Sequence, residues 1–277
     1  MRSSISWSRV ILLIVTTVML MFFWENPVMI PLKVFVVYLH EISHALAALM
    51  TGGDVLMISI RWNESGYIRS AGGIFPIISL AGYLGSVLWG STMLHLAMRG
   101  RGMRAISMLV GATLLIFTLI PDSVPLPGDE RLTKTVAGLF WGCTFVATAA
   151  FFPRINHFLL FFMGGLTSLY SIYDLDDFFA GKVLETDAGI LAKYFLGDSA
   201  LVIVVAYLIA IFVAALSIAI LYRILKTALR HEAPYVDDEE ELEFPEQYPG
   251  EDLPDMPPEM IRWLHQVRES RDKKNEE

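Results

Sequence analysis

The 277-residue chain has little charge and only one cysteine, with charged residues making up 18% of the sequence. The lone Cys143 excludes an internal disulfide and a zinc site built from several thiolates. The charges are also unevenly distributed: residues 231–277 hold 16 acidic and 5 basic side chains, a balance of −11, which leaves +3 for the rest of a chain of net charge −8. Because no segment is strongly basic, nothing in the sequence favours nucleic-acid binding.

Long apolar runs dominate the sequence instead, and hydrophobic residues make up 55% of it. This composition predicts a polytopic α-helical membrane protein with about seven (six to seven) transmembrane helices. Residues 1–27 resemble a signal peptide, but no small-residue cleavage site follows, so we expect a retained N-terminal transmembrane helix. A core of residues 28–222 and an acidic, mostly disordered tail of residues 223–277 complete the predicted organisation. The helices expected in the core are 28–50, 74–98, 105–120, 136–152, 158–175 and 200–222.

The second apolar run contains the motif His40-Glu41-Ile42-Ser43-His44. Side chains four residues apart are neighbours on a helix, so His40 and His44 can bind one zinc ion together. Glu41 lies beside them and is a candidate general base toward a water molecule at the metal. Ionisable residues inside a membrane helix are costly, which favours a functional role over an accidental match.

A short β-hairpin is predicted directly after this helix. Ile58 and Ile60 alternate with Ser59 and Arg61, residues 63–66 resemble a turn, and residues 67–70 can return as a second strand. Unpaired strand edges are not tolerated in lipid, so the hairpin should lie at the membrane interface or in a protein-lined cavity. Two interpretations remain open: an ordinary interfacial loop, or an edge that pairs with an unwound substrate segment.

A catalytic zinc ion usually has three protein ligands, so a third is needed. The helices expected at 28–50 and 158–175 are separated by an even number of crossings and run in the same direction. At about 1.5 Å per residue, Asp174 comes to the depth of His44. Asp174 is therefore the predicted third ligand, with Asp177 as an alternative ligand or as a residue that orients one. His95 is expected to have a packing or interfacial role.

Together these features resemble the site-2 protease family of intramembrane zinc metallopeptidases, and most closely its B-like branch. The resemblance rests on His40 to Ala45, on Thr51-Gly52-Gly53 with the β-segment after it, and on Tyr173 to Asp177, and it covers roughly residues 28–222. It implies a Zn²⁺-dependent protease that cleaves a membrane-embedded protein segment, with Glu41 as the catalytic residue. The Asn-x-x-Pro element typical of the family is missing, so a non-proteolytic transporter or scaffold that retains a zinc site is the alternative.

The expected partners are a membrane protein substrate and the lipid bilayer, and residues 257–271 of the tail have an apolar face that suits a further partner. The expected location is a bacterial inner or cell membrane, which the chain crosses several times. Arginines and lysines flanking the predicted helices support opposite orientations, so the orientation stays open.

Overall fold

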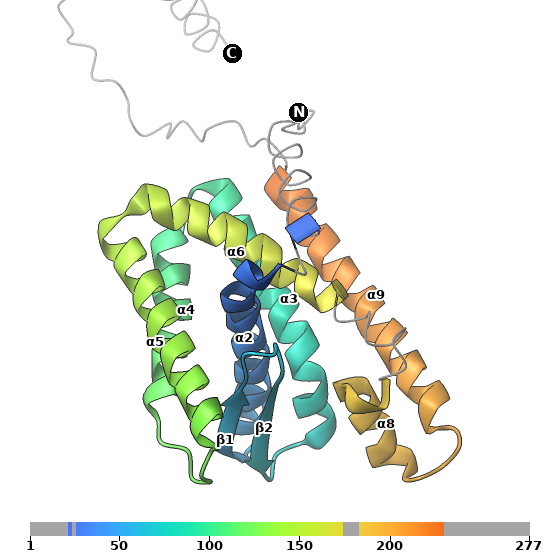
Figure 1. Cartoon of the computed structure of the whole chain (residues 1–277). Coiled ribbons are helices and arrows are strands. Elements are labelled where there is room, and N and C mark those ends of the chain that lie inside the picture. Colours follow the sequence, from blue (N-terminus) through green and yellow to red (C-terminus); the bar gives the residue numbers. More distant parts are fainter. Residues whose placement is uncertain (1–21, 24–25, 174–182, 230–277) are drawn as a thin grey trace, which may run out of the picture. The chain divides into compact units, whose positions relative to one another are not determined.

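The computed structural model describes residues 22–23, 26–173 and 183–229, which are mostly helical (Figure 1). Nearly all of the predicted first helix and the tail beyond Leu229 lie outside these residues. In chain order the elements are η1 (Pro27–Met29), α2 (Ile30–Met50), β1 (Asp54–Ile60), β2 (Gly66–Ala71), α3 (Phe75–Arg99), α4 (Met103–Leu119), α5 (Gly128–Phe151), α6 (Pro153–Tyr173), η2 (Val183–Glu185), α8 (Asp187–Leu196) and α9 (Val202–Leu229).

Helix α2 lies at the centre of the described helices, with α3 on one side and α4 and α5 on the other (Figure 1). Because neighbours surround it, α2 is apolar on nearly all faces rather than along one stripe. Its few polar contacts tie it to these neighbours: the Tyr38 hydroxyl lies 2.8 Å from Thr118 Oγ1, and Trp141 Nε1 donates to the Pro31 carbonyl at 3.0 Å. The packed core around α2 includes Val34, Phe35, Leu39, Ile42, Met93, Leu114 and Phe145.

Four helical segments within the described residues are long and apolar enough to cross a membrane: Pro27–Met50, Phe75–Arg99, Gly128–Phe151 and Val202–Thr227. Helix α4 is apolar but shorter, at 17 residues. The helical membrane-protein class is thus supported, whereas the predicted count of six to seven spans is not confirmed.

The predicted β-hairpin is confirmed as a two-stranded antiparallel sheet, in which Ile58 is paired with Ile68 and Ile60 with Gly66. Two glycines let the chain reverse directly after α2. Gly52 has a φ of 81°, which favours glycine, and a Cβ on Gly53 would lie 2.8 Å from the backbone of Gly72. The hairpin then runs back beside α2, so that it lies along the helix and not beyond its end (Figure 1).

Two helices begin five or more residues earlier than predicted. Helix α5 starts at Gly128, not at residue 136, because two charges of its first turns are buried and paired: Glu130 accepts from Ser59 Oγ at 2.5 Å, and Lys134 lies 2.7 Å from Asp122. Helix α6 starts at Pro153, where a turn was expected. Charged and proline-bearing sequence favoured loops at both places, and tertiary contacts of the charges explain the difference at α5.

Helix α8 lies between the predicted helices 158–175 and 200–222, where no helix was expected. Thr186 caps it, its Oγ1 accepting from Gly189 N at 3.4 Å, and Ala188 and Ala192 pack against α9. These residues form a small hydrophobic cluster of their own, separate from the core around α2. Helices α8 and α9 therefore share a small hydrophobic cluster, while α9 also packs on α3.

Candidate metal centre

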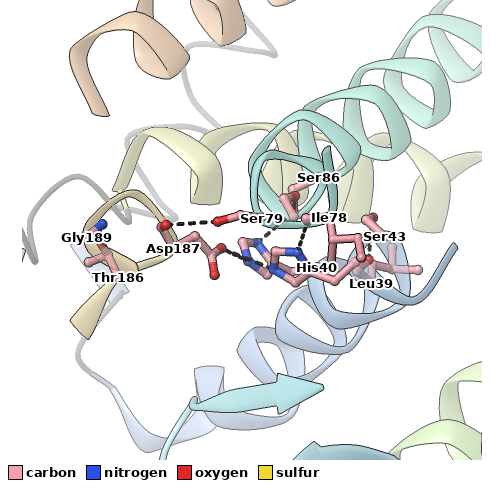
Figure 2. Close-up of polar contacts among 11 residues, drawn as sticks. Leu39, His40, Ser43, Ile78, Ser79, Ser86, Thr186, Asp187 and Gly189 are labelled. Carbon is pink, nitrogen blue, oxygen red and sulfur yellow. Dashed lines mark hydrogen bonds and ion pairs between the residues drawn. The ribbon is translucent and has the colours of Figure 1, made fainter. Parts of the chain in front are cut away.

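Helix α2 presents His40 and His44 one turn apart, as the motif predicts. Their ring centroids are 4.7 Å apart with the ring planes at 74°, and the His44 side chain is buried. His40 points away from α2 towards Asp187 at the start of α8 (Figure 2), and Nε2 of His44 contacts the same aspartate. The local 3.6-residue geometry of the helix is sufficient to bring these two nitrogens together.

The carboxylate that meets both imidazoles belongs to Asp187. Its Oδ2 lies 3.0 Å from His40 Nε2 and 3.1 Å from His44 Nε2 (Figure 2). In a tetrahedral zinc site with bonds of about 2.0 Å, ligand atoms lie about 3.3 Å apart. The two carboxylate–imidazole distances are thus close to the spacing that a zinc ion requires, and all three ligand atoms lie within 4.8 Å of one another.

The other ring nitrogens fix the tautomers that metal binding needs. His44 Nδ1 lies 2.6 Å from the Ile78 carbonyl and must donate to it. His40 Nδ1 lies 3.4 Å from Ser86 Oγ, which itself donates to the Gly82 carbonyl at 2.9 Å and so has a lone pair for His40. Because Nδ1 of each ring is held by its own acceptor, each Nε2 can release a proton held towards Asp187 and offer its lone pair to a metal.

A glycine opposite the histidines keeps the centre open. A Cβ added at Gly82 of α3 would overlap Nε2 of both His40 and His44. Any side chain here would therefore occupy the space in front of the metal-binding nitrogens. Gly85, one turn further along, allows the same close approach to Ser43. The two-histidine, one-carboxylate donor set fits zinc.

Asp187 is held in place by its own helix and by α3. It is the first residue of α8, and its backbone carbonyl accepts from Ser79 Oγ at 2.9 Å. Burial raises the pKa of the Asp187 carboxyl, but the neighbouring His44 and His40 imidazoles outweigh burial and hold the pKa below its usual range. The carboxylate is therefore anionic at neutral pH, as a zinc ligand must be.

Glu41 is buried on α2 next to the first residue of β2. A Cβ on Gly66 would lie 2.8 Å from both Cγ and Oε1 of Glu41, so the strand backbone passes directly over this side chain. The contact places the proposed general base between the metal ligands on its own helix and the start of a strand.

The predicted ligands Asp174 and Asp177 lie outside the described residues. His95 contacts Thr227 of α9, with Nδ1 and Oγ1 3.5 Å apart, which agrees with the packing role expected for it. Sequence reasoning missed Asp187 because it considered membrane-depth carboxylates on long helices only. A local signal was present, since Thr186-Asp187 followed by Ala188, Leu191 and Ala192 is typical of a capped helix start.

The model of one protein family, described as Peptidase M50B-like, matches residues 13–219 of the chain. The chain belongs to the Peptidase M50B-like family. The match includes the histidine motif, the hairpin, α8 and most of α9, so the whole metal centre of this M50B-like protein lies within it. No curated protein and no solved structure matches the chain. M50 proteins are in general membrane-embedded zinc metallopeptidases, and the three-residue group fits that chemistry.

Replacing Ser86 with alanine should weaken zinc binding by roughly 10- to 100-fold, because His40 loses the acceptor that orients its Nδ1 proton. A competition titration against a chromogenic chelator measures this. Ser91→Ala is the matched control, since Ser91 is also buried on α3 and also donates to the carbonyl four residues earlier. Equal affinity in wild type and Ser86→Ala would show that Ser86 does not orient His40.

Proposed function

We propose that this M50B-like protein is a zinc-dependent intramembrane protease whose metal is held by His40, His44 and Asp187. One observation carries the proposal: a single carboxylate oxygen lies 3.0 and 3.1 Å from two imidazole nitrogens whose opposite nitrogens are both engaged. Asp174 and Asp177 remain the competing assignments for the third ligand.

Zinc bound at this centre would supply Lewis-acid polarisation of the scissile carbonyl and a water of lowered pKa. Glu41, buried beside the ligands, takes the proton of the attacking water and returns it to the leaving amine. The Ser86 and Ile78 contacts hold the imidazoles in the required tautomers throughout. Glu41 is only 5% exposed beneath Gly66, which limits the access of bulk water to it and so strengthens its proton transfer.

The substrate in this proposal is a membrane helix that unwinds and pairs with β2. The outer edge of β1 is already occupied, because Ser123 N donates to the Leu56 carbonyl at 2.7 Å and Ile58 N donates to Asp122 Oδ1 at 3.1 Å. In the described part of the chain no third strand pairs with β2, which begins at Gly66 over Glu41. A segment added to β2 would be extended, with its peptide bonds near Glu41.

Metal removal tests the proposal. The full chain in detergent micelles is incubated with a single-span peptide that carries an Asn-Gly pair in its apolar segment. We expect cleavage by the zinc-loaded protein, its loss after treatment with phenanthroline, and its return with added Zn²⁺ but not with Mg²⁺. Cleavage that survives complete removal of zinc would refute a metal-dependent protease.

The missing Asn-x-x-Pro element favours a second candidate, a transporter or scaffold that retains its zinc site. A protein that binds one zinc ion but leaves every such peptide intact would support this alternative. The count of six to seven spans, a bacterial cell membrane and a partner for the acidic tail stay predictions.

A further inference from the structure

A buried lysine lies on α2 well before the metal ligands. Lys33 is two turns before His40 on the same apolar helix, and it is buried. Its Nζ lies 2.9 Å from Glu64 Oε2, at the turn of the β-hairpin. Burying a charge in an apolar helix is costly, which favours a structural or functional role for this lysine.

Glu64 is also unusual in its backbone. Among the described residues it is the one non-glycine with a positive φ, at 67°, in a region that glycine or asparagine usually occupies. The turn around it is closed by Arg61 N donating to the Ser65 carbonyl at 3.0 Å. The sequence thus keeps a strained glutamate where a glycine would be easier, and its carboxylate is what reaches Lys33.

Lys33 of the ion pair and the proposed general base, Glu41, lie on the same face of α2. Lys33, Val37 and Glu41 follow one another at four-residue spacing and so share a face of α2. A Cβ on Gly66 would lie 2.9 Å from Val37 Cγ1 and 2.8 Å from Glu41 Oε1. Gly66 is two residues from Glu64, so the two Cα atoms are at most about 7 Å apart. A shift of the turn therefore also shifts the contact between Gly66 and Glu41.

The hairpin is held on its other side by α5. Glu130 accepts from Ser59 Oγ at 2.5 Å and from Arg61 Nε at 2.8 Å, which fixes the end of β1. These contacts attach the hairpin to α5, and the pairing of Ile60 with Gly66 carries that attachment to the start of β2. The Lys33–Glu64 pair is the charged contact that draws the turn, and with it Gly66, onto α2.

We infer that the Lys33–Glu64 ion pair is a positioning device for Glu41. By fixing the turn, the pair holds Gly66 against the Glu41 side chain and keeps the carboxylate in one place beside the metal ligands. The inference rests on the proposed role of Glu41 and assigns Lys33 and Glu64 as positioning residues, without contact to metal or substrate.

The test compares Lys33→Met, Glu64→Gln and the charge-exchanged double variant Lys33→Glu/Glu64→Lys. Each is assayed as the full chain in micelles with the Asn-Gly peptide, with kcat, KM and zinc content measured, and with hydrogen exchange followed across residues 61–71. Arg131→Met and Asp129→Asn are the controls, because both residues are exposed charges on α5. The single variants should lose roughly 10- to 100-fold in kcat, as expected for a displaced catalytic group, while zinc content and KM stay near wild type.

Faster exchange at the turn should accompany the lower kcat, and the charge-exchanged double variant should recover kcat relative to either single variant. An unchanged kcat, a change in KM alone, or a loss of kcat that follows a loss of zinc would each overturn the inference. Failure of the proposed function gives a different pattern: wild type itself cleaves no peptide, and the catalytic role of the pair falls with it, whatever the exchange rates.

Discussion

Glu41→Gln is expected to abolish cleavage while zinc remains bound. Glutamine keeps the size and the packing of Glu41 against Gly66, but it cannot take a proton from water. General acid–base catalysis contributes about 10²- to 10⁴-fold, so the cleavage rate should fall by at least about 10²-fold relative to wild type. Single-turnover cleavage of the Asn-Gly peptide gives the rate, and metal analysis of the same sample gives the zinc content.

The matched control for this variant is Glu185→Gln, an exposed glutamate in η2 just before α8. It should cleave at the wild-type rate. If Glu41→Gln cleaves as fast as wild type, Glu41 is not the base; if it loses zinc as well as activity, Glu41 belongs to the binding of the metal and its role must be reassigned.

Asp187→Asn is expected to remove zinc from the centre. The amide is neutral and a poor ligand for zinc, so the site is left with two imidazoles and loses its anionic donor. The loss of affinity should exceed the roughly 10- to 100-fold that follows from changing a residue behind a ligand. Equilibrium dialysis with zinc analysis of the full chain measures the affinity directly.

Three further variants decide between the candidate ligands. Asp198→Asn, an exposed aspartate in the α8–α9 connection, should bind zinc like wild type. Asp174→Asn and Asp177→Asn should also keep zinc if Asp187 is the third ligand. Should Asp174→Asn lose zinc while Asp187→Asn keeps it, the assignment made from helix depth is the correct one, and Asp187 only pairs with the histidines when metal is absent.

Local patterns made part of the site predictable. The spacing of His40 and His44 needs only a helix to bring two nitrogens together, and the alternation around Ile58 and Ile60 needs only its own residues to specify a strand. The third carboxylate is a different problem, since Asp187 is 143 residues beyond His44 and reaches it only through the packing of α8 on α3 and α9. A ten-residue helix in a polar connection gives a weak periodic signal, so the depth of long helices dominated the argument.

The position of the hairpin beside α2 could not be predicted from its local sequence either. Its existence follows from alternation, but its course along α2 depends on pairs of charges from distant elements. Lys33 with Glu64, and Glu130 with Ser59, join residues 31 and 71 positions apart. Charges also misled the placement of α5, because Glu130 and Lys134 resemble loop residues until their partners Ser59 and Asp122 are known.

The hydrophobic cluster shared by α8 and α9 has a consequence for the metal centre. Two ligands belong to the core around α2, whereas Asp187 belongs to a helical pair with its own hydrophobic cluster. A metal bound by all three would join the core around α2 to the α8–α9 pair in addition to the packing of α9 on α3, so part of its binding free energy would stabilise that attachment. Metal affinity is then coupled to the attachment of the α8–α9 pair. A substitution that weakens the packing of α8 on α3 should lower metal affinity, even where it touches no ligand.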